Sequence, residues 1–189
     1  MNKVIAHFKK ICKHKSLVAK HCFYCGLYWQ GIVHDLSKFT PTEFIESVKY
    51  YQGDHSPIDE AKKDKGYSEA WMHHKSRNKH HYEYWQDEFD KGTKHIKMPF
   101  KYVLEYVCDS LAASKTYLGD SFTYDKYLEW WNHSTRDGMN IESKRCVGNI
   151  IKKICEYKSE KRILSDRNYI SMIKRLYETN YFADVEVKR

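Results

Sequence analysis

The sequence predicts an all-α domain, and three observations support this fold class. Apolar residues recur at helical spacing along most of the chain, and no segment alternates apolar with polar residues as a half-buried strand does. Only eight glycines and three prolines occur among the 189 residues, which leaves little of the turn chemistry that hairpins require. A chain of this length suits one domain with a substantial buried core.

Two helices are expected to open the chain, at residues 2–22 and 26–36. The first places Ile11 and Val18 on one face and lysines on the other, and the second is shorter and more apolar.

Local start signals place the next helices. The motif TPTE at residues 40–43 has the form of a capping box with proline at the first helical position, which predicts a helix to about residue 52. A Ser-Pro pair at 56–57 opens a short charged helix, and Ser68 starts a further helix over residues 69–78.

The second half of the chain contains the longest apolar helix and several shorter ones. Residues 91–98 are expected to form a loop, and Pro99 then opens a helix that ends near Gly119. Shorter helices are predicted at 124–132, 142–157 and 167–179. We expect residues 1–120 to form the helical core and 121–189 a basic helical part packed on the same domain.

The chain carries a net charge of +8, with 33 basic against 25 acidic residues. The surplus is uneven, because residues 142–189 hold twelve Lys or Arg against seven Asp or Glu. Such a balance favours an anionic partner, either a small phosphorylated molecule or nucleic acid. A solvated, lysine-rich helix surface explains it equally well.

The sequence also indicates the cellular compartment of the protein. No stretch approaches the roughly 18 uninterrupted apolar residues of a membrane span, and the N-terminal segment lacks the apolar region of a signal peptide. We therefore expect a cytoplasmic protein without a membrane partner, whose six cysteines stay reduced. Cys22 and Cys25 have the C-x-x-C spacing, but no second pair follows, so inert or buried thiols are expected.

The most informative segment is HDLSK at residues 34–38, because further histidines and an aspartate accompany it. One histidine lies upstream, the pairs at 73–74 and 80–81 lie downstream, and an aspartate sits in the long apolar helix. Imidazoles mixed with carboxylates are typical ligands of iron, manganese or zinc. The candidate metal ligands are His14, His34, Asp35, His74, His81 and Asp109.

The spacing of His14 suggests that it faces the interior. His7, His14 and His21 recur every seven residues, so they share one helix face, and Ile11 lies on the same face. A core histidine with a hydrogen-bond partner would explain any one of the three alone. The position of His14 upstream of the HDLSK motif favours a role as a metal ligand.

Lys38 is the candidate catalytic residue. On a helix, His34 and Asp35 would lie about 100° apart and could flank a metal from one edge. Lys38 follows them by four and three residues, which places its ammonium beside both. It is expected to neutralise a substrate phosphate or to protonate a leaving oxygen, and a salt bridge to Asp35 is the alternative role.

Four histidines fall within the nine residues HHKSRNKHH. If the helix continued through this segment, His74 and His81 would share one face, which favours them as ligands. The adjacent face would carry His73, Arg77 and His80, which are then expected to contact substrate or to support the ligands. The opposite phase, with His73 and His80 as ligands, also fits the spacing.

Asp109 lies among apolar residues of the long predicted helix, between Val107 and Leu111. A buried carboxylate is costly unless it meets a cation, and solvent exposure is the alternative. Lys115 follows six residues later and is expected to offer a further contact to phosphate.

Taken in chain order, this set resembles the HD-domain superfamily of all-helical, metal-dependent phosphohydrolases, which also includes diiron oxygenases. The segments HDLSKFTPTEF and MPFKYVLEYVCDSLAA most resemble sequences of the dinuclear branch, which contains cyclic-dinucleotide phosphodiesterases. The Gly-Tyr-Pro signature of that branch is absent from this chain. More closely, HDLSKFTPTEF, GYSEAW and HHKSRNKHHYEYW resemble a small bacterial family of unknown function. The resemblance covers about residues 10–120.

Six ligands exceed what one ion with open positions needs, so two ions bridged by Asp35 are expected, with Fe or Mn favoured and Zn possible. The favoured function is hydrolysis of a nucleotide or other phosphorylated small molecule, with Lys38, Arg77 and Lys115 neutralising charge. The resemblance makes a mixed-valent diiron oxygenase the alternative enzyme. A nucleic-acid-binding protein that uses its basic C-terminal surface is the third hypothesis.

Overall fold

The computed structural model of the protein describes residues 2–183. Within this range the chain forms ten α-helices, three short 3₁₀ turns and one two-stranded sheet, which confirms the all-α prediction. The helices in chain order are α1 (Lys3–Tyr24), α2 (Tyr28–Val33), α3 (Pro41–Lys49), α4 (Pro57–Lys65), α5 (Glu69–Arg77), α6 (Phe100–Leu118), α7 (Tyr124–His133), α8 (Ile141–Tyr157), α9 (Glu160–Leu164) and α10 (Arg167–Glu178). The strands are β1 (Gln86–Phe89) and β2 (Gly92–His95).

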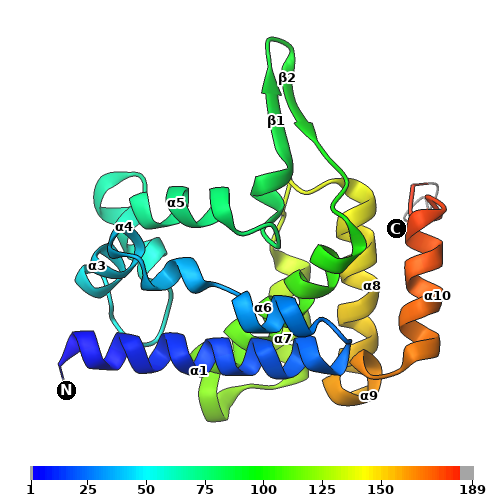
Figure 1. Ribbon diagram of the computed structural model, residues 1–189, viewed down its shortest axis with the longest axis horizontal. Helices are drawn as coiled ribbons and strands as arrows, with labels where there is room; N and C mark the ends of the chain where they lie inside the picture. The colour runs from blue at the N-terminus through cyan, green and yellow to red at the C-terminus, as the bar shows by residue number, and fades with distance from the viewer. Residues whose placement is uncertain (1, 184–189) are drawn as a thin grey trace.

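Helix α1 runs along one side of the molecule, from the α3 end to the vicinity of α9 (Figure 1). It contacts α3 toward its N-terminus and α9 toward its C-terminus, and it packs along α6 and α2. Helices α3, α4 and α5 form a smaller group at one end, and α7 to α10 form a larger group at the other. The β1–β2 hairpin projects away from both groups.

The main hydrophobic core lies where α6, α7, α8 and α10 meet the second half of α1. Its fully buried members include Val18, Val107, Leu111, Ile150 and Leu164. Because this core draws on residues from α1 to α10, the basic C-terminal part packs on the same core as α6. Burial of such side chains is the main driving force for folding.

The long helices end where the sequence signals predict. Helix α6 starts directly after Pro99 and ends at Leu118, and the following Gly119 has a positive φ of 52°, which suits a residue without a Cβ. The side chain of Asn140 accepts hydrogen bonds from two backbone N–H groups of α8, and that of Asp166 does the same for α10. These side chains satisfy donors that have no partner within the helix.

The prediction that His34 and Asp35 lie on a helix is wrong. Helix α2 ends at Val33, the backbone of His34 leaves the helical region with a ψ of 128°, and Asp35 is left-handed with a φ of 54°. Aspartate tolerates this conformation better than most residues. The break places His34 and Asp35 in a link between α2 and the 3₁₀ turn Leu36–Phe39.

The helix predicted over residues 69–78 is present as α5, but its continuation to His81, which would place His74 and His81 on one face, does not occur. The helix ends at Arg77, and Asn78 caps it, since both its backbone N–H and its side-chain amide donate to the carbonyl of His74. Asparagine competes with the helix by such local bonds. His80 and His81 therefore lie on the segment that follows the helix, so helical phase does not decide which histidines share a face.

The hairpin was not predicted. Gln86 pairs with His95 and Phe89 with Gly92 in an antiparallel ladder, where a loop over residues 91–98 was expected. Both strands are almost wholly exposed. A strand that buries neither face has no need for the alternation that identifies strands in a sequence.

The prediction of a capping box at residues 40–43 is only half correct. Helix α3 does start at Pro41, but the hydroxyl of Thr40 donates to the carbonyl of Ser37 and does not cap the helix. Glu43 is buried and accepts hydrogen bonds from histidines of α5 instead. None of the described helices combines the length with the apolar character that crossing a membrane requires.

Candidate metal centre

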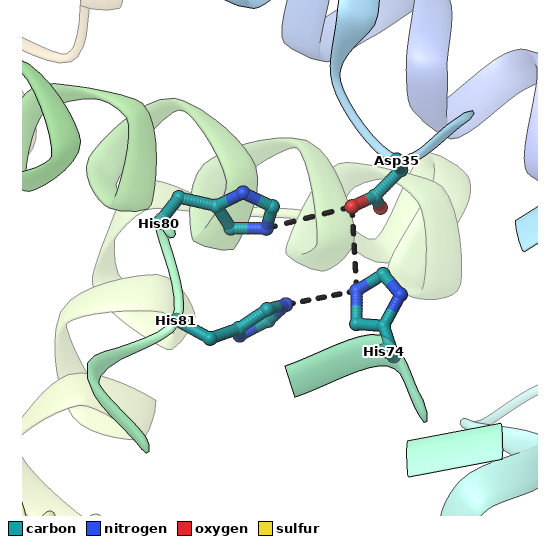
Figure 2. A group of neighbouring side chains, drawn as sticks. All are labelled: Asp35, His74, His80 and His81. Carbon is teal, nitrogen blue, oxygen red and sulfur yellow. Dashed lines mark hydrogen bonds and ion pairs between the residues drawn. The ribbon is translucent and has the colours of Figure 1, made fainter. Parts of the chain in front are cut away.

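Seven buried or half-buried ligand side chains converge between α1, α5 and α6. Helix α1 contributes His14, the link after α2 contributes His34 and Asp35, and α6 contributes Asp109. The remaining three come from α5 and the segment after it, and Figure 2 shows them around Asp35. They are His74, His80 and His81.

Asp35 divides these side chains into two groups, because each of its carboxylate oxygens faces one of them. Oδ1 lies 3.3 Å from Nε2 of His74 and 3.5 Å from Nε2 of His80. Oδ2 lies 3.3 Å from Nε2 of His34 and 3.6 Å from Nε2 of His14. Asp35 is therefore the member common to both groups, as a bridging carboxylate is in a dinuclear site.

Asp109 and His81 are the remaining members of the two groups. Oδ1 of Asp109 lies 3.0 Å from Nε2 of His14 and 3.4 Å from Nε2 of His34. On the other side, the Nε2 atoms of His74 and His81 are 3.0 Å apart (Figure 2). The first group is thus His14, His34, Asp35 and Asp109, and the second is Asp35, His74, His80 and His81.

These separations match the geometry of ligands around one ion. Atoms that lie about 2.1 Å from a metal are about 3.0 Å apart at right angles and about 3.4 Å apart at the tetrahedral angle. The nitrogen–oxygen contacts within the groups run from 3.0 Å, between His14 and Asp109, to 3.6 Å, between His14 and Asp35, and all ligand atoms of a group lie within 4.8 Å of one another.

Several polar atoms that point into the centre have only one another and one lysine as neighbours. Nε2 of His14, His34 and His80 and both oxygens of Asp35 are buried and make no hydrogen bond outside the centre, and the Lys38 ammonium meets Oδ2 of Asp35. Buried polar atoms are almost always partnered, and leaving several unpaired in one place is costly. A cation in each group would satisfy all of them, so the residues fit a metal.

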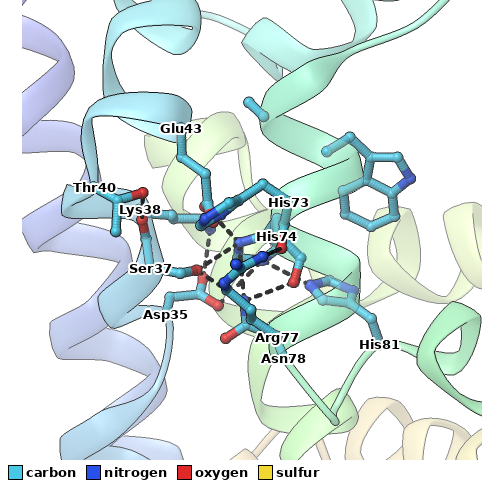
Figure 3. A network of polar contacts seen from close by, with 12 residues as sticks. Asp35, Ser37, Lys38, Thr40, Glu43, His73, His74, Arg77, Asn78 and His81 are labelled. Atoms are coloured by element: carbon cyan, nitrogen blue, oxygen red, sulfur yellow. Dashed lines mark hydrogen bonds and ion pairs between the residues drawn. The ribbon is translucent and has the colours of Figure 1, made fainter.

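The outer nitrogens of the histidines are held by two buried glutamates that the sequence analysis did not identify. Oε1 of Glu105 accepts from Nδ1 of His34 at 3.0 Å and lies 3.3 Å from Nδ1 of His80. Glu43 accepts from Nδ1 of His74 at 2.7 Å and from Nδ1 of His73 at 2.6 Å (Figure 3). A carboxylate at Nδ1 fixes the tautomer that leaves Nε2 free to bind a metal.

The electrostatics of the centre keep its carboxylates ionised. Burial raises the pKa of Asp35, but His34 and Lys38 outweigh it and hold that pKa well below its ordinary value. Burial also opposes ionisation of Asp109, yet its bonds to His14 and His34 bring the pKa well below normal. Burial and the neighbouring His80 lower the pKa of His81, so this imidazole is neutral. Against the effect of burial, Asp35 raises the pKa of His34 and His74, so a metal ion would displace a proton from these two imidazoles. Ionised carboxylates and neutral imidazoles are the forms that bind metals.

Lys38 lies at the centre as its spacing predicts. Its Nζ is 2.5 Å from Oδ2 of Asp35, and its side chain remains partly exposed. Burial lowers the pKa of Lys38, but the neighbouring Asp35 and Asp109 carboxylates more than compensate and raise it, so the ammonium keeps its charge. The structure therefore combines the predicted salt bridge with a cation that borders the open side of the site.

The other predicted contacts lie outside the two groups. His73 bonds Glu43 and does not reach either group. Arg77 is exposed and contacts the His73 carbonyl and Ser76. Lys115 pairs with Glu160 between α6 and α9, because six residues place it on a different face of α6 from Asp109.

A cavity of about 230 Å³ adjoins the centre. His14, Lys38, His74, His81 and Asp109 line it at the centre. A second hollow, of about 280 Å³, borders His34, His80 and Arg77 on the side of Glu105. Since Nδ1 of His34 and His80 points toward Glu105, that hollow lies behind the ligands.

The comparisons with known proteins give one match. A family model described as "Family of unknown function (DUF5662)" matches residues 3–153, which span α1 to most of α8. Neither a curated protein nor a solved structure matches the chain significantly.

Proposed function

We propose that this chain, which belongs to the family of unknown function DUF5662, is a metal-dependent phosphohydrolase with a dinuclear centre. The observation that carries the proposal is Asp35, whose two oxygens each face a separate group of ligand atoms that includes buried imidazole nitrogens without hydrogen-bond partners. The proposed substrate is a nucleotide or another small phosphorylated molecule. The resemblance of the ligand order to the HD-domain superfamily supports this assignment.

The donor set favours particular metals. Every ligand atom is an imidazole nitrogen or a carboxylate oxygen, and no thiolate takes part, which suits Fe or Mn better than a structural zinc site. When bound, two such ions lower the pKa of a water and withdraw charge from a phosphoryl group.

The side chains of the protein have separate roles in this proposal. Glu43 and Glu105 orient the imidazoles through Nδ1, so that Nε2 points inward without rearrangement. Lys38 carries a positive charge at the edge of the cavity, where an anionic substrate would approach the centre. Its ammonium can stabilise charge on the phosphoryl oxygens or donate a proton to the leaving oxygen.

A diiron oxygenase is the second candidate, because the same set of imidazoles and carboxylates suits non-haem iron. Oxygen dependence separates the two functions. A phosphohydrolase releases its product without O₂, whereas an oxygenase requires O₂ as a substrate.

The cytoplasm is the proposed compartment, since all six cysteines are free thiols and five are buried.

The proposal is tested by measuring metal content and p-nitrophenol release on the same preparation under anaerobic conditions. The probes are p-nitrophenyl phosphate and bis(p-nitrophenyl) phosphate. We expect hydrolysis by the wild type and its loss, together with metal, in Asp35→Asn. His133→Ala is the control, because His133 is exposed on α7 and bonds only the Glu129 carbonyl. Metal-free wild-type protein, or hydrolysis unaffected by Asp35→Asn, would contradict the proposal.

A further inference from the structure

The cavity extends from the candidate metal centre to a second polar region on α1 and α6. At that region His7 and Thr116 line the cavity. His7 lies seven residues before His14 on the same helix, so the two positions are about 10 Å apart along the α1 axis. A molecule that spans this distance contacts both regions.

His7 and Thr116 are buried without hydrogen-bond partners. His7 is 6% exposed, Thr116 is 3% exposed, and neither ring nitrogen of His7 nor Oγ1 of Thr116 has a partner. The rings of Phe44 and Tyr51 are the aromatic neighbours of His7, at centroid distances of 5.6 and 5.1 Å. Two unpaired polar groups on one cavity are unusual and indicate a missing polar partner.

The other histidines of the same helix face show the contrast. Nε2 of His14 faces Asp109 at 3.0 Å in the candidate metal centre. His21 lies against the Cys108 carbonyl through Nδ1 and faces Glu160 through Nε2. Both therefore have identified roles, and His7 is the one of the three that neither packs on a polar partner nor belongs to a ligand group.

The chemistry of the region favours an uncharged partner. Burial, and then the charge of Lys38, lowers the pKa of His7 to about 4, so the ring is neutral and offers one donor and one acceptor. The hydroxyl of Thr116 likewise donates and accepts. The cavity wall between the two regions is mainly apolar and includes Ile11, Ile58 and Trp71.

The size of the cavity limits the ligand. Its volume of about 230 Å³ is below the roughly 300–1,000 Å³ of sites for drug-sized ligands. The nearest additional cation is Lys10, whose Nζ already donates to the carbonyl of Thr116 at 3.4 Å. A small ligand with an anionic group at the metal end and an uncharged polar group at the far end satisfies both regions.

We propose that this cavity binds a small phosphate ester whose organic group is mainly apolar and ends in one hydroxyl-like group, hydrogen-bonded by His7 and Thr116. The inference rests on the proposed function, since it places the phosphate at the metal centre. It makes His7 and Thr116 determinants of specificity that do not take part in bond cleavage.

The test uses three phosphonates that cannot be hydrolysed and differ only at the far end: benzylphosphonate, 4-hydroxybenzylphosphonate and 4-carboxybenzylphosphonate. Their binding to the Mn²⁺-loaded protein is measured by calorimetry. We expect the hydroxyl compound to bind about tenfold more tightly than the parent, as one or two hydrogen bonds in a desolvated site provide. His7→Phe and Thr116→Val should each reduce this preference while affinity for benzylphosphonate stays within about threefold.

The control variants are His133→Phe and Thr42→Val, which change exposed residues outside the cavity and should keep the preference. Equal binding of the parent and hydroxyl compounds, or no binding of either, overturns the inference. A preference that survives both His7→Phe and Thr116→Val also overturns it, as does tighter binding of the carboxylate compound. If the preference behaves as expected but no phosphate ester is hydrolysed, the proposed function fails and the binding site stands.

Discussion

Glu105 contacts both candidate metal groups, so its charge should support both ions. Its Oε1 accepts from Nδ1 of His34, a ligand on the Oδ2 side of Asp35, and lies 3.3 Å from Nδ1 of His80, a ligand on the Oδ1 side. Glu105→Gln keeps the size of the side chain and removes its negative charge. Loss of such an outer partner costs about 10- to 100-fold in metal affinity.

For Glu105 this factor should apply to each ion, which corresponds to about 1.4 to 2.8 kcal/mol of binding free energy per ion. Glu43→Gln is the matched comparison, because Glu43 bonds His74 and His73 and reaches one group only. Glu142→Gln is the neutral control, since Glu142 pairs with Lys97 on another side of the core. Calorimetric titration of metal-free protein with Mn²⁺ measures the affinities.

Glu105→Gln should weaken both binding events and Glu43→Gln only one. The reasoning is refuted if Glu105→Gln leaves both affinities within about twofold of the wild type. It is also refuted if the loss is confined to one ion, because the contacts of Glu105 with His34 and His80 would then not join the two groups.

Two further variants test Lys38 and the contact between α1 and α9. Lys38→Met should keep the metal while turnover falls by roughly 10²-fold or more, as expected for one lost proton donor or anion contact. Unchanged activity per bound metal would contradict this role and would mean that Lys38 serves only as the salt-bridge partner of Asp35. Glu160 faces His21 and bonds Lys115 and Tyr124, and the contact with His21 and the other bonds lower its pKa against the effect of burial. A carboxyl whose pKa is depressed by folding stabilises the protein above its unfolded pKa of about 4.3, and this stability is lost as the pH falls below that value. Glu160→Gln should therefore lower the free energy of unfolding by about 2 kcal/mol at pH 7 and by less at pH 3, as measured by urea denaturation; an equal loss at both pH values would contradict it.

The sequence predicted the helices whose ends carry local signals. Pro99 and Gly119 bound α6, and the asparagine before α8 caps its first turn, so these elements follow from neighbouring residues. The exposed hairpin follows from no apolar pattern, because neither of its faces packs on the core. The six predicted ligands come together in the structure: His14, His74 and Asp109 lie on the helices α1, α5 and α6, and His34, Asp35 and His81 lie on the segments that follow α2 and α5.

The parts of the site that the sequence did not predict depend on contacts between distant residues. Glu43 fits a capping box in the sequence, and only the approach of α5 shows that it bonds His73 and His74 instead. Glu105 has no local signal, since its partners lie 71 and 25 residues away. His80 lies in the same group as His74 and His81 because Asn78 ends α5, whereas helical phase would place His80 on a different face from those two residues.

Crystals of the Mn²⁺-loaded protein, with anomalous scattering recorded at the manganese edge, would locate the ions directly. We expect two anomalous peaks, one on each side of the Asp35 carboxylate. One should lie among His14, His34 and Asp109, and the other among His74, His80 and His81. A single peak that does not contact Asp35, or no peak between α1, α5 and α6, would contradict a dinuclear centre bridged by Asp35.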